Sequence, residues 1–488
     1  MTSSAFRFLS RTSRSEKALF LIFVLSLPLA NPWVRGDGVG YYAYARALLI
    51  EHRLDFTKDW QHGNESFTMG RIGADGRIDP QEFTKTGHIS NNWTIGPALL
   101  WLPFLAVTHA GVLAADAMGA HVAADGFSWP YIEVMALTTA LYGFLGLWIS
   151  FRLARGYFSE AWALLATVGI WWASSLPVYM YFNPSWSHAH SAFVAALLLW
   201  YWHRTRKERT WKQWIVLGLI SGLAVDIYYI NGVLLLVPLL EAISKYGKLW
   251  RLNAGWMAAG RLFAKHVLYL GSFGVALLPT LISLDVIYGS PFSTGYPTVG
   301  SWSWHAPAFL SVLFSSDHGL LSWTPILGIA LIGLAAFSRS DRAFAAYLAV
   351  SVAAFFAVVA LHPDWDGLSS FGNRFFISLT PIFILGLAAF FEWLSRIWRE
   401  DRVLRAGVAA TALLIVWNQG LIFQWGTHLI PARGPISFRQ AAYNQVAVVP
   451  VEVASTVKRY FLRRHQLMNR IENEDVHQLK SGEPDGND

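Results

Sequence analysis

One carboxylate stands where the first hydrophobic segment of the chain ends. Asp37 lies in the sequence Arg-Gly-Asp-Gly-Val-Gly-Tyr-Tyr, between a basic residue and a run of small and aromatic residues. A carboxylate in this setting can take a proton from a hydroxyl group, as a general base does. It can equally cap a helix that begins near Tyr41, because an acid before a helix suits the helix dipole. Tyr41 and Tyr42 follow closely enough to contact a sugar or acceptor held at Asp37.

Two basic residues elsewhere in the chain have the chemistry to hold a phosphate. Lys85 lies in a polar stretch just before an apolar segment, and Arg374 leads directly into another one. Fixed cations stabilise a departing phosphate, and an arginine can hold it through two hydrogen bonds. Each residue also has a simpler interpretation. Lys85 can reach lipid headgroups, and Arg374 can anchor a helix at the membrane interface.

Further polar side chains have the chemistry to bind a sugar or acceptor. Asp364 and Asp366 flank Trp365, so that the carboxylates can bind hydroxyl groups while the indole stacks on the sugar ring. Alternatively, one of the two carboxylates pairs with the arginine that follows them. His188 and His190 stand at the start of an apolar segment, with no carboxylate beside them in sequence. We therefore favour substrate hydrogen bonding by His188 over a metal site, and no cofactor is required.

The apolar segments of the chain must position these side chains. The chain has 488 residues, of which 54% are hydrophobic and 14% are charged. Its apolar runs repeatedly approach the roughly 20 residues that cross a bilayer, which predicts an all-α polytopic membrane protein. The net charge of +7 comes from short basic clusters beside these runs, so a nucleic-acid partner is not expected. The absence of cysteine excludes a disulfide framework, a thiolate metal site and a cysteine nucleophile.

The basic clusters predict how the helices cross. Basic residues before the first apolar run place the N-terminus in the cytoplasm, and Arg152, Arg155 and residues 204–212 mark two further cytoplasmic turns. These positions agree only if the proline-containing segment over residues 95–115 lies along the outer face as an interfacial helix. We therefore expect about eleven transmembrane helices and a long first external loop over residues 35–129.

This topology puts every long polar segment on the outer face. No cytoplasmic region is large enough to bind a nucleotide, and no phosphate-binding glycine motif is present. We expect a membrane domain over residues 1–425, then an amphipathic segment and a disordered tail over residues 426–488. The helix count leaves this tail outside, although its basic stretch over residues 451–464 would also suit the cytoplasmic leaflet. The last residues, 472–488, have the polar composition of a disordered segment.

Several strings resemble the GT-C fold of glycosyltransferases that use lipid-phosphate-linked sugars. The resemblance is to bacterial family-39-like members, related to protein mannosyltransferases and aminoarabinose transferases, and covers roughly residues 15–425. The strings are Asp37-Gly-Val-Gly-Tyr-Tyr, Ile95-Gly-Pro-Ala-Leu-Leu-Trp-Leu-Pro-Phe, His318-Gly-Leu-Leu-Ser-Trp-Thr-Pro and Ser370-Phe-Gly-Asn-Arg-Phe-Phe. The resemblance implies an inverting transfer in which Asp37 is the base or a carboxylate that orients the acceptor, and an external Lys85 or Arg374 holds the lipid phosphate. Many protein-modifying members carry a second acid where this chain has Gly38, which leaves the acceptor open.

The residues and the resemblance together predict a hexosyl- or pentosyltransferase in the inner membrane. It would move a sugar from a polyprenyl-phosphate donor to a glycan or lipid acceptor on the periplasmic or extracellular face. One alternative is a transporter or flippase of a lipid-linked glycan, for which Asp226 and Asp285 are the acids at mid-membrane. Another is a polymerase or ligase that uses a diphosphate-linked oligosaccharide.

Overall fold

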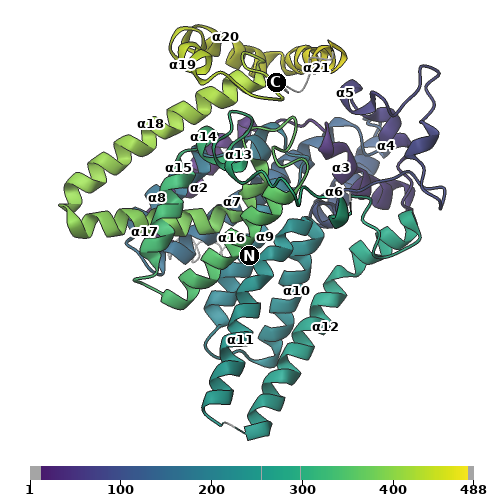
Figure 1. The fold of residues 1–488 in the computed structure, drawn as a ribbon. Helices are drawn as coiled ribbons and strands as arrows, with labels where there is room; N and C mark the ends of the chain where they lie inside the picture. The colour runs from purple at the N-terminus through teal and green to yellow at the C-terminus, as the bar shows by residue number, and fades with distance from the viewer. Residues whose placement is uncertain (1–11, 254, 297, 482–488) are drawn as a thin grey trace.

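The described part of the protein is all-helical. The computed structural model describes residues 12–253, 255–296 and 298–481. Within these ranges the chain forms helices and loops, and its only extended pairings are two isolated bridges, Ile72 with Ile78 and Phe83 with Ile89. Figure 1 shows long helices packed side by side, with α10, α11 and α12 projecting at one end and α19, α20 and α21 lying across the other. The predicted all-α class is confirmed.

The helices of the first part of the chain alternate between long apolar segments and short turns. They are α2 (Arg14–Ser26), η1 (Leu27–Leu29), α3 (Asp37–Arg46), η2 (Ala47–Glu51), α4 (Thr57–His62), α5 (Glu65–Thr68), η3 (Pro80–Glu82), α6 (Gly96–Ala117), α7 (Trp129–Arg155), α8 (Glu160–Trp172), η4 (Val178–Phe182), α9 (His188–Thr205), α10 (Trp211–Ile227), η5 (Tyr229–Leu235) and α11 (Leu236–Arg251).

The remaining helices complete the bundle and add a C-terminal group. They are α12 (Gly255–Tyr288), η6 (Val299–Ser301), α13 (Phe309–Phe314), α14 (Leu320–Trp323), α15 (Ile326–Phe337), α16 (Arg342–Leu361), η7 (Arg374–Leu379), α17 (Thr380–Ile397), α18 (Glu400–Gly426), α19 (Phe438–Ala447), α20 (Val449–Leu462) and α21 (Arg464–Ser481).

Seven helical segments within the described ranges are long and apolar enough to cross a membrane. They are Gly96–Ala117, Trp129–Arg155, Tyr229–Arg251, Gly255–Tyr288, Arg342–Leu361, Arg374–Ile397 and Glu400–Gly426. Other apolar helices are shorter: α2 and α8 have 13 residues each, α10 has 17 and α15 has 12. Local breaks explain part of this, because α2 runs into a 3-10 turn that contains Pro28. The expected count of about eleven crossings therefore stays a prediction.

The segment predicted to lie along the outer face forms α6. It is long enough to cross, yet its side chains meet the first half of α7. Trp101 donates to Thr139 at 2.9 Å, and His109 lies 2.7 Å from the hydroxyl of Tyr131. At its start, a Cβ on Gly96 would lie 2.4 Å from the backbone at the end of α10. α6 is thus fixed beside the start of α7 and the end of α10, and its interfacial position stays a prediction.

Small residues let the central helices approach closely. α15 and α17 touch backbone to backbone, because a Cβ on Gly333 would lie 1.9 Å from the carbonyl oxygen of Gly386. Such contacts are typical of packed membrane helices. α17 is buried along most of its length, and its leading turn, η7, begins at Arg374. The arginine is therefore placed by one of the most deeply buried elements of the bundle.

The C-terminal segment is helical where disorder was expected. Residues 472–481 belong to α21, so the predicted disorder is wrong there, while residues 482–488 lie outside the described part of the chain. The helix has partners on the first long loop. Glu472 accepts hydrogen bonds from Asn64 and Ser66, and Lys480 pairs with Glu65 at 2.9 Å. This polar segment folds against the same face that carries α3 (Figure 1).

Candidate functional site

Asp37 opens α3 and points its carboxylate at an arginine. The cap position belongs to Gly36, which has a φ of +51° and no side-chain cap, and α3 begins before Tyr41. This left-handed backbone conformation favours glycine. The Asp37 carboxylate lies 3.0 Å from the guanidinium of Arg374, with side-chain exposures of 31% and 11%. Asp37 is therefore not the capping residue of this helix. It pairs instead with Arg374, which is distant from it in the sequence.

Trp186 supports both members of this pair. The guanidinium of Arg374 lies over its indole ring, 4.3 Å from the centroid, which is a cation–π contact. The indole N–H donates to the carbonyl of Arg35 at 3.0 Å, and a Cβ on Gly36 would lie 3.2 Å from the same ring. One aromatic side chain thus fixes the arginine and the backbone turn that presents Asp37.

Gly38 allows this turn to pack closely against the segment before α9. A Cβ on Gly38 would lie only 1.9 Å from the Oγ of Ser185 and 2.6 Å from its Cβ. Any larger residue would force the start of α3 away from its support. A second acid directly after Asp37 would therefore have no room here.

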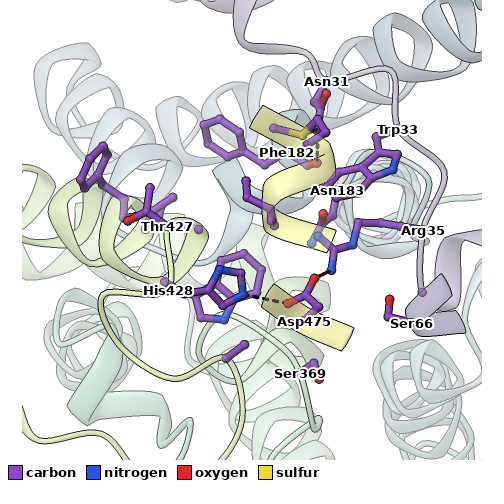
Figure 2. A pocket seen from close by; sticks show the side chains of 18 of the residues that line it. Asn31, Trp33, Arg35, Ser66, Phe182, Asn183, Ser369, Thr427, His428 and Asp475 are labelled. Atoms are coloured by element: carbon purple, nitrogen blue, oxygen red, sulfur yellow. Dashed lines mark hydrogen bonds and ion pairs between the residues drawn. The ribbon is translucent and has the colours of Figure 1, made fainter. Parts of the chain in front are cut away.

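The Asp37–Arg374 pair lines a cavity of about 850 Å³. The polar end contains Arg35, Ser66 and Asn183 beside the pair, and Figure 2 shows Arg35 and Asn183 together at one side. The remaining walls are largely apolar and come from the ends of η1, η4 and α18 and from α20 and α21. Their apolar side chains are Leu29, Phe182, Ile422, Phe423, Trp425, Val453, Val457, Tyr460, Phe461, Leu467, Met468, Ile471 and Leu479. The cavity therefore combines a charged end with a long apolar surface.

Residues 131–268 match the family of dolichyl-phosphate-mannose-protein mannosyltransferases. The match confirms, over that segment, the resemblance seen in the sequence. It includes His188 but neither Asp37 nor Arg374.

Solved structures and curated proteins were also compared with the chain. The chain is similar to ArnT from Cupriavidus metallidurans bound to undecaprenyl phosphate, with 13% identity and a TM-score of 0.48 over 99% of this chain and 79% of that one. The same protein in the apo state gives 13% identity and a TM-score of 0.46 over 91% and 75%. A comparison with curated proteins gave no significant match. None of these similarities assigns a residue of the site.

Tyr41, Tyr42 and His188 are buried and do not line the cavity. Tyr41 is buried and accepts a hydrogen bond from Ser187 at 3.0 Å. Burial, followed by the charge of Asp37, raises the pKa of Tyr41, so this ring is within electrostatic reach of the pair. Tyr42 instead donates to the carbonyl of Gly126 at 2.7 Å. His188 is buried, with its ring 4.7 Å from that of Tyr179. Their predicted contact with substrate stays a prediction.

The turn with the two aspartates contributes to the site through its second half. Gly367, Leu368 and Ser369 line the cavity. The alternative in which Asp364 or Asp366 pairs with Arg374 is not what the structure shows, because the arginine pairs with Asp37. Neither Asp364 nor Asp366 lines the cavity.

Three side chains with the chemistry to bind a metal lie together where the sequence did not suggest it. The ligand atoms of Asp317, His318 and Asp366 lie within 4.8 Å of one another. Burial lowers the pKa of His318 to about 3, and neutral imidazole is the form that binds metals. Burial also raises the pKa of Asp366. His318 Nδ1 already lies 3.2 Å from the carbonyl oxygen of Asp366. This contact joins two loops, which is a structural role that needs no metal.

Lys85 is not brought to the pair by any contact within the described residues. It is exposed, and its Cε lies 3.3 Å from the position of a Cβ on Gly289. The cavity is lined instead by the cations Arg35, Arg374 and Arg433. Arg35 stands two residues before Asp37 in sequence, and this proximity could have indicated it as a third candidate cation.

Proposed function

We propose that the protein is a glycosyltransferase that takes its sugar from a polyprenyl-phosphate donor. The observation that carries this proposal is the Asp37–Arg374 pair in a cavity that joins charged and polar side chains to a long apolar surface. A phosphate joined to a long hydrocarbon chain has the same division between charge and apolar surface. The family matched over residues 131–268 is described by a lipid-phosphate sugar donor, which supports the same class of substrate.

The proposed reaction is a single displacement at the anomeric carbon of the donor sugar. The acceptor hydroxyl oxygen forms a bond to that carbon while its proton passes to the Asp37 carboxylate. The bond between the anomeric carbon and the phosphate oxygen breaks, and polyprenyl phosphate leaves with the bonding electrons. Attack from the side opposite the phosphate inverts the configuration of the sugar. The guanidinium of Arg374 offsets the negative charge that develops on the phosphate.

The ion pair gives this reaction its geometry. Arg374 holds the Asp37 carboxylate at 3.0 Å, and Trp186 holds the guanidinium from the other side. Donor phosphate would enter beside Arg374 and share its positive charge with the carboxylate. Fixed groups of this kind need no reorganisation during the reaction, which is why they contribute strongly to catalysis.

We propose that the site lies on the outer face of the membrane, with the N-terminus in the cytoplasm and a glycan or lipid as the acceptor. The basic turn between α11 and α12 supports this orientation, because positively charged turns favour the cytoplasmic side. That turn carries Lys248 and Arg251 and lies at the opposite end of the molecule from α3 (Figure 1).

Asp37→Asn tests the proposal most simply. Loss of the general base should lower the rate of transfer by about 10²- to 10⁴-fold, with the protein folded and still binding lipid phosphate. Asp75→Asn is the matched control, since Asp75 lies in the same loop with its side chain 62% exposed. That variant should transfer at the normal rate. Normal turnover by Asp37→Asn would show that this carboxylate is not the base.

The class of donor is tested separately by supplying the purified protein with polyprenyl-monophosphate and polyprenyl-diphosphate sugars. We expect transfer from the monophosphate donor. Transfer only from a diphosphate-linked oligosaccharide would favour a polymerase or ligase. Movement of the lipid across the membrane without a new glycosidic bond would favour a flippase.

A further inference from the structure

A carboxylate from the C-terminal helix occupies the charged end of the cavity. Asp475 of α21 pairs with the guanidinium of Arg35, and their side chains are 13% and 18% exposed. His428 Nε2 lies 2.8 Å from the other carboxylate oxygen. Figure 2 shows the Asp475 carboxylate between Arg35 and His428, facing the space lined by Asn183 and Ser66. An anion is therefore already bound by a cavity cation.

This arginine belongs to the same structural unit as the catalytic pair. The backbone carbonyl of Arg35 accepts the hydrogen bond of Trp186, and the same indole carries the guanidinium of Arg374. The side chain of Arg35 lies over Trp33, with 4.3 Å to the ring centroid, and lines the cavity together with Asp37. Two fixed guanidinium groups thus border one polar space.

α21 is anchored at its start, where Arg464 donates to the carbonyl of Ala30 at 2.8 Å, and the rest of the helix is attached to the first loop. Near Asp475, Glu472 accepts hydrogen bonds from Asn64 at 2.8 Å and from the backbone of Ser66 at 2.7 Å. Lys480 and Glu65 pair at 2.9 Å with exposures of 61% and 58%. Surface pairs of this kind contribute little to stability. The contacts of α21 with the first loop are the ones that a competing ligand must break, while Arg464 keeps the start of the helix in place.

The inner surface of these helices is apolar and faces the cavity. Leu467, Met468 and Ile471 of α21 line it, together with Val457 and Phe461 of α20.

Burial of the Asp475 carboxyl opposes ionisation, but the hydrogen bond from His428 and the charge of Arg35 outweigh it, so the pKa of Asp475 is lowered. The carboxylate is charged at neutral pH and competes directly with any other anion at Arg35.

We propose that Arg35 is a second phosphate-binding residue and that Asp475 masks it in the substrate-free protein, so that α21 is a lid displaced by a lipid phosphate. This inference rests on the proposed function, because it takes the ligand to be a polyprenyl phosphate. The phosphate replaces the Asp475 carboxylate on Arg35, and α21 then releases its contacts with the first loop. The apolar chain of the lipid takes up the surface that α21 covered.

The lid is tested by locking it in place. The chain contains no cysteine, so introduced thiols are its only ones. Glu65→Cys combined with Lys480→Cys replaces an exposed pair on the two sides of the contact. Bridging the two thiols with a crosslinker that contains a reducible disulfide should weaken the binding of polyprenyl phosphate by about tenfold or more, and a reductant should restore it. The single variant Glu65→Cys is the control. Equal affinity of the double variant with the two thiols bridged and with the bridge reduced would contradict the proposal that α21 is a lid.

The competition is tested by removing one charge at a time. Asp475→Asn should bind polyprenyl phosphate about three- to tenfold more tightly, because a like charge no longer occupies Arg35. Arg35→Gln should bind it more weakly. Glu474→Gln is the matched control, because Glu474 is exposed on the same helix, and its affinity should equal that of the unmodified protein. Unchanged or weaker binding by Asp475→Asn would show that Asp475 builds the site, which contradicts masking.

These experiments measure binding without transfer. Their outcome is therefore separate from that of Asp37→Asn. If transfer depends on Asp37 but the protein with α21 locked in place binds lipid normally, the proposal of a lid is wrong and the proposed function stands. If the lid responds to polyprenyl phosphate while Asp37→Asn turns over normally, the assignment of the base is wrong and the lid stands.

Discussion

Gly38→Ala places one methyl group at the tightest contact of the site. The added Cβ would lie 1.9 Å from the Oγ of Ser185, 2.6 Å from its Cβ and 3.1 Å from the indole of Trp186. The hydroxyl can rotate away, but the Cβ of Ser185 cannot. The start of α3 must then move by roughly 1 Å to restore an ordinary van der Waals separation.

The size of the effect follows from this displacement. Overpacking of a close contact costs about 1–3 kcal/mol of folding stability. The effect on catalysis should be larger, because a misplacement of about 1 Å can lower a rate by roughly 10²-fold. Asp37 directly precedes Gly38, so its carboxylate moves with the turn and away from Arg374.

The assay is sugar transfer by purified protein, with thermal unfolding measured on the same samples. Gly111→Ala is the control, because nothing lies within 4 Å of a Cβ at that position. The second variant, Ser185→Gly in the Gly38→Ala background, removes both atoms of the clash and should restore most of the activity. Full activity of Gly38→Ala alone would refute the reasoning. So would a double variant that is no more active than the single one.

Two further variants test the packing that supports the site. Arg46 donates to both Asp59 oxygens at 2.7 Å and to Glu51 at 2.9 Å. Asp59→Asn should lower the free energy of unfolding by about 1.5–3 kcal/mol, because the buried guanidinium loses one of its two carboxylate partners. Arg53→Gln, which removes an arginine that is 70% exposed, should change the unfolding temperature little. Gly96→Ala should lower the unfolding temperature by separating α6 from α10, since its Cβ would lie 2.4 Å from the backbone there. An unchanged unfolding temperature in Asp59→Asn or Gly96→Ala would show that the corresponding contact is not needed.

The helical class could be predicted because it depends on local properties. The length and composition of each apolar segment can be read directly from the sequence, and they indicate membrane helices without knowledge of the packing. The number of crossings is harder to predict, because short helices such as α8 and α15 end at turns that composition does not mark. Asp37 and Arg374 were found for a similar reason, since each stands next to an apolar segment.

The partners of these residues could not be predicted, because they come from distant parts of the chain. Nothing near Arg374 in sequence indicates that it pairs with Asp37 and not with Asp366. Lys85 occupies a plausible headgroup position, but its loop folds against the end of α12 beside Gly289.

The C-terminal wall of the cavity was missed for a different reason. Residues 472–481 are polar and have the composition of a disordered segment. They form a helix here against partners on the first loop, including Asn64 and Ser66. Composition alone does not reveal such partners. The role of Asp475 therefore became visible only in the folded structure.

The most direct test of the central claim is an experimental structure of the protein with bound polyprenyl phosphate. The account predicts that the phosphate lies in the cavity, within hydrogen-bond distance of Arg374, with the Asp37 carboxylate beside it and the hydrocarbon chain along α18 and α20. A phosphate bound at Lys85, or elsewhere outside this cavity, would contradict the account.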